Sequence, residues 1–430
     1  MTFDRVTRNA RFREMLLLGL AGAFLLVNAI VLDLAADNLW TPTLLFLLWA
    51  VTAIAGHRAL NRSLPQRDPF IYPIAMLLSG WGLLMIQRLA PNFAWRQAMW
   101  LLLSLGVMLA ISTLPMHLRW LRRYRYTWLF GGLTLLLVTI LLGVNPSGAG
   151  PRLWLGARGL FFQPSELLKP VLVIFLASYM ADYRDLIRND GRETRYLPLA
   201  RALGPLLLMW GLCMVVVIWQ QDLGTATLFF IVFLTLLYIA SGQGLYVLIG
   251  MALLLLAAIA AYRLFDVVQL RVDVWLNPWP EANGRAFQIV QSLQAFAAGD
   301  VLGQGIGLGS PIYIPVIHSD FIFAAVAEEW GLIGVLTVLS SFAVLVMRGL
   351  QLAALWSEAP FRMLMAAGLS MLLAVQSLLI MGGVLKIIPM TGVTLPFMSY
   401  GGSSLLVNFA LVGLFLVLST SRATEETTAP

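Results

Sequence analysis

Long apolar runs alternate with short polar segments along the whole chain. A helix needs about 20 mostly apolar residues to cross a hydrocarbon core. Runs that meet or approach this length recur near residues 15–35, 40–56, 69–87, 97–115, 127–145, 166–182, 202–219, 223–240, 244–265, 321–347, 362–384 and 403–420. The pattern therefore predicts an all-α, polytopic integral membrane protein with about twelve transmembrane helices.

Composition supports this prediction. Of the 430 residues, 60% are hydrophobic and 11% are charged, which is about half the charged share of a soluble globular chain. A water-soluble fold is therefore excluded. The single cysteine, Cys213, lies inside an apolar run, so an intrachain disulfide is excluded as well. The first run is long and is followed by others, so we expect no cleavable signal peptide.

Arginine and lysine set the expected orientation, because cytoplasmic loops retain them preferentially. The basic residues gather before the first run and after the second, fourth and sixth, at 5–13, 58–67, 119–125 and 184–201. Both termini should therefore be cytoplasmic. Each basic cluster is a short loop between apolar runs, so the net charge of +7 reflects topology, and we expect no nucleic-acid partner.

The chain is expected to fall into three parts. The first two runs form an accessory hairpin, residues 1–67, which a basic stretch ending at Arg67 separates from a ten-span core, residues 68–420. A short cytoplasmic tail, residues 421–430, is polar and is expected to be disordered. Four of the segments assigned to the outer side, 146–165, 220–222, 266–320 and 385–402, have polar residues with Gly or Pro among them or, for 220–222, two residues further on at Gly224. This combination is typical of backbone that lines a cavity in a membrane.

The segment 151–169, PRLWLGARGLFFQPSELLK, ends at the mouth of a span. Glu166 and Lys169 are three residues apart and share a helix face. Ionisable pairs within membranes are costly and are usually functional, whereas the alternative is a capped helix start at Ser165 and Glu166. Asp222, in QQDLGTA, is interpreted first as a cap of the following helix.

The stretch 266–320 is too long for a simple connection, and such loops are usually functional. It contains GQGIGLGS at 303–310, whose alternating glycines match no nucleotide-binding fingerprint. They indicate a flexible loop or a close approach of backbones. The three histidines are scattered and have no metal-ligand spacing.

Asp320 stands directly before a span, in IHSDFIF. A partly desolvated carboxylate there would have a raised pKa and could take a proton from a bound hydroxyl. An N-cap is an equally good interpretation, with Glu328 and Glu329 further along the same helix. After Lys386, the segment PMTGVTLPFMSYGGSS breaks the backbone where a span should begin, which is typical of a cavity lining.

Four motifs occur in order: QPSE with Lys169 three residues after its glutamate, QQDLGTA, HSDFIFAAVAEEWG and TGVTLPFMSYGGSS. Together they resemble the SEDS family of peptidoglycan glycosyltransferases, which includes RodA, FtsW and SpoVE. The similarity extends from about Asp68 to Thr420 and agrees with the family's ten-span core. It implies polymerisation of lipid II on the extracytoplasmic face of the bacterial cell membrane, during cell-wall synthesis in cell shape or division.

The resemblance also assigns roles. Asp320 matches the family's essential aspartate and would be the catalytic base of an inverting displacement, with undecaprenyl diphosphate as leaving group. The residues implied in binding substrate or diphosphate are Arg152, Gln163, Ser165, Glu166, Lys169, His318, Lys386, Ser399 and Ser403. Asp222, Glu328 and Glu329 would support them. Glu166 or Asp222 could hold a divalent cation, Mg²⁺ or Mn²⁺; no organic cofactor is expected. The expected partners are lipid II, undecaprenyl-diphosphate-linked glycan and a class B penicillin-binding protein.

This chain departs from the family pattern at several positions. Val316 replaces an acidic residue and Ser319 a threonine in the usual Pro-Glu-x-His-Thr-Asp. Ile380 replaces an asparagine, and Gln221 replaces the proline of QPDLG. The Val316 change weakens any mechanism that needs a second carboxylate in that loop. The alternative function is a flippase that transports lipid II, since broken helices and buried charges serve transporters too.

Overall fold

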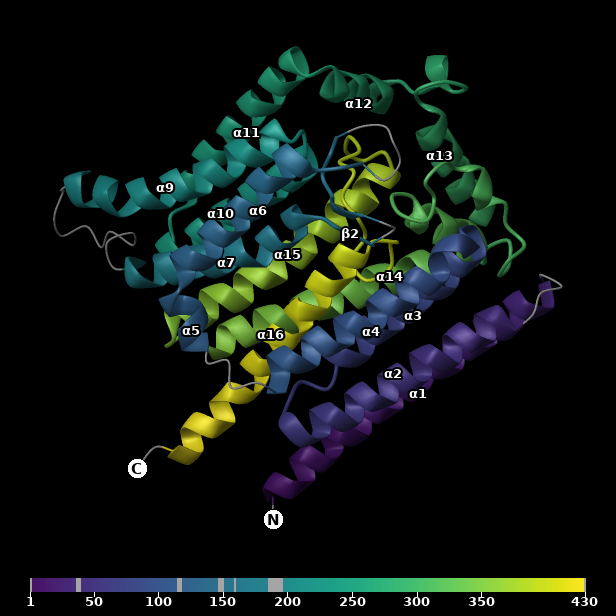
Figure 1. The fold of residues 1–430 in the computed structure, drawn as a ribbon, viewed down its shortest axis with the longest axis horizontal. Helices are drawn as coiled ribbons and strands as arrows, with labels where there is room; N and C mark the ends of the chain where they lie inside the picture. Colours follow the sequence, from purple (N-terminus) through teal and green to yellow (C-terminus); the bar gives the residue numbers. More distant parts are fainter. Residues whose placement is uncertain are drawn as a thin grey trace. The chain divides into compact units, whose positions relative to one another are not determined.

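The computed structural model describes residues 2–35, 40–113, 118–145, 151–157, 160–184 and 196–428. Three segments lie partly outside these residues: the outer link expected between the first two spans, near 36–40, the outer segment 146–165 and the basic segment 184–201. The α-helices are α1 (Thr2–Ala35), α2 (Thr41–Ser63), α3 (Ile71–Leu89), α4 (Pro91–Thr113), α5 (Leu118–Arg123), α6 (Arg125–Leu142), α7 (Pro164–Asp182), α9 (Tyr196–Trp219), α10 (Leu223–Ser241), α11 (Gly244–Leu264), α12 (Asp266–Leu276), α13 (Phe287–Gly299), α14 (Ile322–Leu355), α15 (Pro360–Val384) and α16 (Gly402–Thr428), as drawn in Figure 1.

The helical fold class is confirmed, with one small addition that the sequence analysis missed. Strands β1 (Leu155–Ala157) and β2 (Leu160–Phe162) pair antiparallel, with Leu155 opposite Phe162. Two short 3₁₀ turns, η1 (Trp279–Glu281) and η2 (Pro311–Tyr313), lie in the long segment before α14. The polar tail is helical as far as Thr428 rather than disordered, because α16 continues through helix-forming Ala and Glu residues without a proline.

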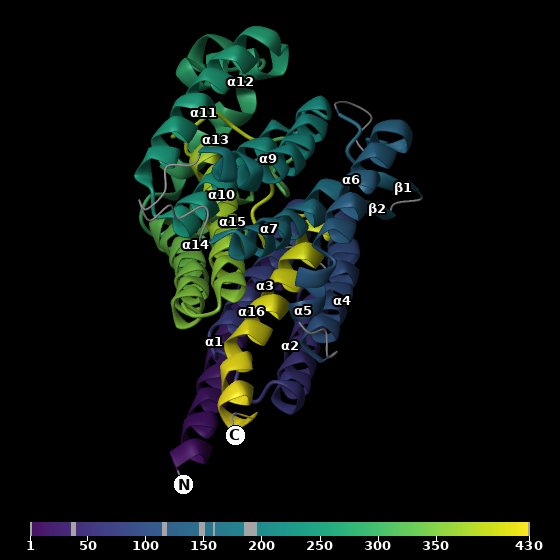
Figure 2. The same cartoon turned by 90° about the vertical axis from the view of Figure 1, so that its left-hand side faces the viewer.

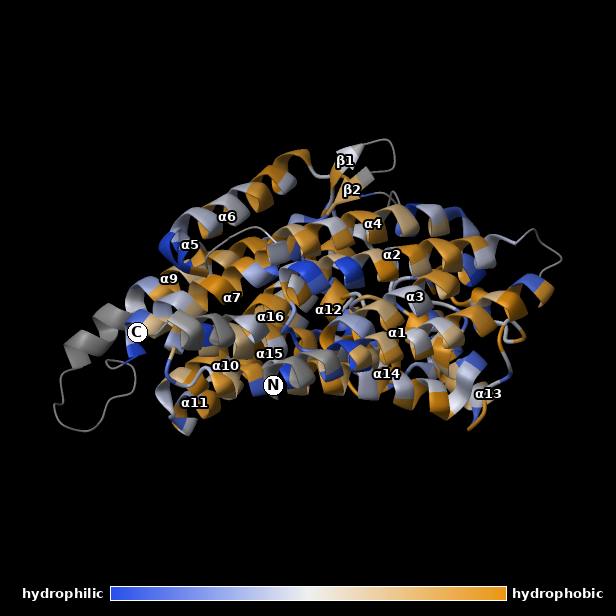
Figure 3. Cartoon of the chain, turned by 90° about the horizontal axis from the view of Figure 1, so that it is seen from below, coloured by the Kyte–Doolittle hydropathy of each residue, from blue (hydrophilic) through white to orange (hydrophobic). Residues whose placement is uncertain are grey.

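Ten helices of the described chain are long and apolar enough to cross a membrane. All ten coincide with predicted spans, and Figure 3 shows hydrophobic residues along the helices with hydrophilic residues gathered at ends such as α5. The two other predicted spans are helices as well, α3 and α9, but α3 is not among the ten and the apolar part of α9 is only Gly204–Trp219. The count of twelve and the cytoplasmic location of the termini stay predictions.

The chain divides into two compact units. Unit 1 comprises residues 1–115, 270–348 and 376–430, and unit 2 comprises residues 116–269 and 349–375. In unit 1, α1 packs on α2 and α3, α2 packs on α4, and α16 packs on α3 and α4. The start of α1 and the end of α16 lie at the same end of this unit, as Figures 1 and 2 both show.

Unit 2 is built around α7 and α10. Helix α7 packs against α6, α9 and α10, and α10 also contacts α11. In the most apolar window of α7, 89% of the residues are buried, whereas in α11 only 6% are. An apolar membrane helix whose residues are not covered by protein must face lipid. Helix α11 is therefore a lipid-facing helix, and α7 is a core helix.

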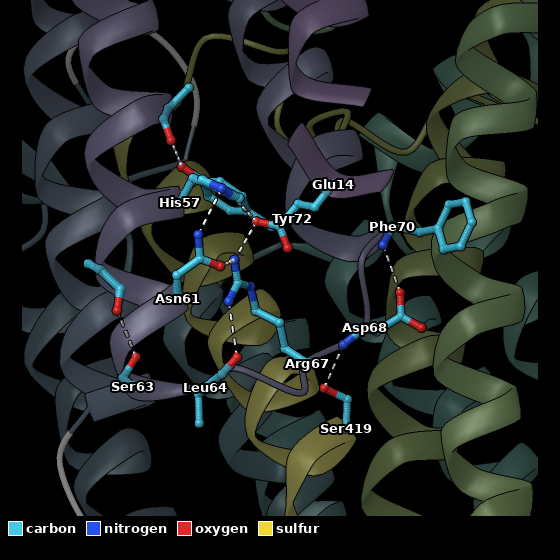
Figure 4. Close-up of polar contacts among 12 residues, drawn as sticks. Glu14, His57, Asn61, Ser63, Leu64, Arg67, Asp68, Phe70, Tyr72 and Ser419 are labelled. Atoms are coloured by element: carbon cyan, nitrogen blue, oxygen red, sulfur yellow. Dashed lines mark hydrogen bonds and ion pairs between the residues drawn. The ribbon is translucent and has the colours of Figure 1, made fainter. Parts of the chain in front are cut away.

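A buried polar network ties the predicted hairpin to the segment that follows it (Figure 4). Glu14 of α1 accepts hydrogen bonds from Arg67 at 2.5 Å and contacts His57 Nδ1 at 2.7 Å. Arg67 also donates to Asn61 Oδ1 at 2.9 Å. Only 2% of each side chain of the Glu14–Arg67 pair is exposed. Next to it, the Asp68 amide donates to Ser419 Oγ of α16. Arg67 is therefore a buried ion-pair partner and not a solvated loop residue.

Candidate active site

Helix α14 is interrupted close to its start, and the glycine-rich loop fits into the interruption. Gly331 has φ 60° and ψ −154°, which is not helical. The amides of Leu332 and Ile333 therefore donate to the carbonyls of Asp300 and Val301, at 3.0 and 3.4 Å. In return, the carbonyls of Glu328 and Glu329 accept from the amides of Gln304 and Gly305, at 2.8 and 3.1 Å. Residues 300–305 thus satisfy four of the backbone groups that the break releases.

Glycine is required at several of these contacts. A Cβ on Gly299 would lie 1.9 Å from the Ala327 carbonyl oxygen, and one on Gly303 would lie 2.2 Å from that of Glu329. Gly303 also has φ +83°, a conformation that side chains disfavour. Of the two interpretations of GQGIGLGS, close backbone approach is confirmed.

Asp320 follows this loop, in a turn that starts at Val316. The amides of Ser319 and Asp320 both donate to the Val316 carbonyl, at 3.1 and 3.3 Å. Val316 has φ 57°, which is unfavourable for a β-branched residue. Strain of this kind persists only where the surroundings impose it and is concentrated at functional sites.

The Asp320 carboxylate does not cap α14. Among the described residues it accepts one hydrogen bond, from Ser319 Oγ at 2.9 Å, and none from a backbone amide. Burial raises the pKa of this carboxyl above its usual value, while the Ser319 hydroxyl and the nearby charge of Arg271 oppose the shift. The geometry favours the proton acceptor over the cap, because a lone, partly desolvated carboxylate keeps acceptor capacity for a ligand.

His318 packs against aromatic rings beside the turn. Its ring stacks on Phe93 at 4.9 Å between centroids, and Phe93 lies 4.6 Å from Tyr400. The Tyr400 amide also donates to the His318 carbonyl at 2.8 Å. Burial lowers the pKa of His318, which favours the neutral ring. A neutral, stacked imidazole suits positioning better than the diphosphate contact implied for it.

The broken segment before α16 holds the same turn from another direction. Ser399 Oγ donates to the Ser319 carbonyl at 2.5 Å and accepts from the Leu395 amide at 3.0 Å. Ser399 is buried, as is Ser403 in the first turn of α16. Ser399 therefore links the two segments, and its hydroxyl is committed within the protein.

Arg271 of α12 was missed as a site residue, although the sequence analysis marked its loop. Its Nη1 donates to the Thr391 carbonyl at 3.2 Å, and its charge acts on Asp320. Lys386 has φ 58°, and its carbonyl accepts from Trp275 Nε1 at 3.1 Å. Helix α12 thus places one cation near Asp320, which no spacing rule in the sequence could reveal.

In unit 2, the hairpin of β1 and β2 leads into α7 and its charge pair. Lys169 Nζ donates to Glu166 Oε1 at 2.7 Å, and the side chains are 1% and 6% exposed. The shared helix face predicted for this pair is confirmed. The other oxygen, Glu166 Oε2, is buried and has no hydrogen-bond partner among the described residues, which is costly unless a ligand or water satisfies it.

Around this pair, hydrogen bonds join the starts of α7 and α10. Gln163 Nε2 donates to Ser165 Oγ at 3.0 Å, and Ser165 Oγ donates to Asp222 Oδ2 at 3.1 Å. Asp222 caps α10 by accepting from the Thr225 amide at 3.1 Å, as predicted. Ser165, in contrast, caps nothing: Gln163 holds the N-cap position of α7 and makes no side-chain cap bond.

Two further expectations concern ligands in unit 2. Arg152 is exposed, as a residue that meets a charged substrate directly must be. No group of three or more His, Cys, Asp or Glu side chains in the described chain is placed to hold a metal ion. Both Asp222 oxygens already accept a hydrogen bond, from the Thr225 amide and from Ser165, whereas Glu166 Oε2 accepts none from the described residues. Glu166 Oε2 is therefore the better candidate for a ligand.

Comparison with known proteins places these motifs in one family. The FtsW/RodA/SpoVE profile, described as cell cycle protein, matches residues 70–424. Peptidoglycan glycosyltransferase RodA of Mycobacterium tuberculosis is 36% identical over 428 residues, covering 96% of this chain and 90% of the relative. The probable peptidoglycan glycosyltransferase FtsW of Geobacter sulfurreducens is 34% identical, covering 84% of this chain and 96% of the relative.

Solved structures resemble the fold. A chain of a peptidoglycan synthase complex, described by its coordination of polymerization and crosslinking, matches with a TM-score of 0.67 and 26% identity, covering 82% of this chain and 97% of that chain. The crystal structure of the rod shape determining protein RodA of Thermus thermophilus matches with a TM-score of 0.59 and 25% identity, over 83% of this chain and 97% of that chain.

Proposed function

Because this chain belongs to the FtsW/RodA/SpoVE family, we propose that it is a membrane-embedded peptidoglycan glycosyltransferase that polymerises lipid II in cell-wall synthesis. Relatives named for this activity match 96% of the chain. The observation that carries the proposal is Asp320, a desolvated carboxylate with a raised pKa that is not used as a helix cap. The turn 316–320 contains no second carboxylate, because Val316 stands where other family members have an acidic residue.

The proposed reaction is a single displacement. Asp320 accepts the proton of an acceptor-sugar hydroxyl while that oxygen forms a bond to the anomeric carbon of the donor glycan. The bond from this carbon to the undecaprenyl diphosphate oxygen breaks, and the diphosphate leaves with the electron pair. Because the base activates an oxygen that attacks from the side opposite the leaving group, the configuration at the anomeric carbon is inverted, by analogy with inverting glycosidases. A raised pKa makes Asp320 a stronger base than an ordinary carboxylate.

The departing diphosphate needs positive charge, which is most effective when it is preorganised in a water-poor place. Arg271 is suited to this by its charge beside Asp320. For Arg152 and Lys169, the assignment to the diphosphate follows from the family resemblance. Of these two, the exposed Arg152 suits direct contact, whereas the buried pairing of Lys169 with Glu166 suits a role in holding the start of α7.

A divalent cation is proposed only as a companion of the substrate. The described residues provide no protein-only cage, and Mg²⁺ is commonly held by one or two carboxylates together with substrate phosphates. Glu166 Oε2 is the oxygen that would join it. Such an ion would neutralise charge on the diphosphate.

The active face is proposed to be extracytoplasmic, because the basic loops assign the termini to the cytoplasm. A class B penicillin-binding protein is the proposed partner, supported by the likeness to a chain of a peptidoglycan synthase complex that couples polymerization to crosslinking.

The test is polymerisation of purified lipid II by the full-length protein with its partner in detergent. We expect glycan strands from the parent protein and none from Asp320→Asn, which keeps the size of the side chain and removes the base. Binding of lipid II by this variant, with an unchanged melting temperature, would show that chemistry alone is lost.

Two outcomes would contradict the proposal. Polymerisation by Asp320→Asn at the parent rate would remove Asp320 as the base. Translocation of lipid II across liposomes without any polymerisation would favour the transporter.

A further inference from the structure

Arg88, at the end of α3, contacts the glycine-rich loop and α14 at once. Its Nη2 donates to the carbonyls of Gly307 and Gly309, at 3.0 and 3.1 Å. Its Nε lies 3.5 Å from Glu329 Oε1, in a pair whose glutamate is fully buried. A planar guanidinium can bind several acceptors in fixed directions, which an ammonium group cannot. Arg88 therefore fixes the second half of the loop, Gly307–Gly309, onto α14.

Glu328 completes this attachment from the neighbouring position. Its Oε1 accepts from the Ser310 amide at 2.6 Å. Beyond Ser310, the chain passes through the short turn η2 and reaches Asp320 ten residues later. The loop 303–310 is thus held at both of its ends by Glu328 and Glu329, which lie just before the α14 break. The segment that carries Asp320 therefore starts from a fixed point.

Helix α1 of the N-terminal hairpin reaches the same loop. A Cβ on Gly307 would lie 3.4 Å from Leu32 Cδ2, 3.6 Å from Ala35 Cβ and 3.8 Å from Arg88 Nε. Leu32 is 4% exposed, whereas Leu34 on the same helix is 79% exposed. The end of α1 is therefore packed against the loop, with one face buried on it and the other face open.

A row of aromatic rings joins the same elements nearer their middles. Phe24 of α1 contacts Trp81 of α3 edge-on at 5.0 Å, and Trp81 contacts Trp330 of α14 edge-on at 5.3 Å. Trp330 lies between Glu329 and the break at Gly331. In the first half of α1, the Glu14 network of Figure 4 secures the helix. Helix α1 is therefore held at three positions, Glu14, Phe24 and Leu32.

We propose that Arg88, supported by α1 of the hairpin, is a positioning residue for Asp320. It acts through the loop 303–310 and touches no reacting atom. This inference rests on the proposed function for its effect on catalysis, but the support of the loop can be measured without activity. It gives α1 a role in positioning the catalytic residue, in addition to anchoring the protein in the membrane.

The first measurement is amide hydrogen exchange of the full-length protein in detergent. In Arg88→Ala, the amides of Gln304, Gly305 and Ser310 are expected to exchange at least about tenfold faster. The loop then loses the hydrogen bonds from Arg88 to the carbonyls of Gly307 and Gly309 and opens more often. Arg285→Ala is the matched control, since Arg285 is 63% exposed in a pair with Glu281 in the same segment. That control should leave the three amides unchanged.

The second measurement is the kinetics of lipid II polymerisation. Arg88→Ala should lower kcat on the order of 100-fold with KM changed by less than about threefold, because small misplacements of a catalytic group cost about this much. The acidic limb of the kcat profile should also move to lower pH, since a displaced Asp320 is better hydrated. Arg88→Lys should recover part of kcat. Leu32→Ala should act in the same direction as Arg88→Ala, and Leu34→Ala should not.

The results separate the two hypotheses. Faster exchange without polymerisation by the parent protein would support the loop attachment and contradict the proposed function. An active parent with unchanged exchange, kcat and pH profile in Arg88→Ala would overturn the inference. A lower melting temperature with an unmoved pH profile would also overturn it, because Arg88 would then serve stability alone.

Discussion

Removing one member of the buried Glu14–Arg67 pair should destabilise the protein strongly. In Arg67→Met, Glu14 stays 98% buried and loses the guanidinium 2.5 Å away. A buried charge that loses its only partner costs about 3–5 kcal/mol, and the remaining contact of Glu14 with His57 Nδ1 at 2.7 Å offsets part of this cost.

The double variant Glu14→Leu/Arg67→Met provides the decisive comparison. It removes both charges. Asn61 Oδ1 then loses its donor, and His57 loses its contact with Glu14, although its side chain is 15% exposed and therefore accessible to water. One orphaned acceptor costs about 1–3 kcal/mol. The double variant should therefore be more stable than Arg67→Met alone, which only coupled residues can produce.

The assay is equilibrium unfolding of purified protein in detergent micelles, titrated with a denaturing detergent. Arg285→Ala, which breaks an exposed pair, should change the free energy of unfolding by less than about 1 kcal/mol. The reasoning is refuted if Arg67→Met falls within that same range, or if the free-energy changes of Glu14→Leu and Arg67→Met, each measured alone, add up to that of the double variant.

Three further predictions concern the candidate site. The pKa of Asp320 is raised, and the carboxylate acts as a base only above that pKa. We therefore expect kcat to rise with pH, with the midpoint of the rise above the ordinary Asp pKa of about 3.9. A pH profile whose rise is centred at or below that value would contradict this prediction. Lys169→Met should leave Glu166 as an unpaired buried charge and cost about 3–5 kcal/mol in the same unfolding assay, whereas a neutral result would mean that water reaches the pair. Gly303→Ala should force the loop away from Glu329, because its Cβ would lie 2.2 Å from a backbone oxygen; we expect at least about tenfold loss of kcat, measured beside Gly106→Ala, a site with open space.

Much of the site was predictable because its chemistry is local in sequence. Glu166 and Lys169 are one helical turn apart, so their pairing follows from spacing. Asp222 precedes a helix and caps it, as its position indicates. Asp320 also precedes a helix but caps nothing. The same local pattern thus had two outcomes, and only the surroundings of each carboxylate distinguish them.

The residues that sequence analysis missed act over long separations. Arg88 meets Gly307, which is 219 residues away, and Arg271 meets Thr391, which is 120 residues away. Nothing beside either arginine in the sequence indicates its partner. Arg67 was assigned to a cytoplasmic basic loop, and only packing shows that Glu14 of α1 is buried against it.

The sequence alone determined the helical membrane fold. In lipid the backbone must form its hydrogen bonds within the protein, which leaves few structures besides helices, and each long apolar run can be recognised without the others. The sequence also determined the order of the motifs and therefore the family. Only the tertiary structure shows how the motifs are arranged. Helix α14 is interrupted at Gly331, and backbone groups on both sides of the interruption form hydrogen bonds with residues 300–305. Arg88 and the end of α1 contact the loop 303–310. These contacts depend on where distant helices end in space, which apolar periodicity does not record, since it reports only that each helix is buried in lipid or protein.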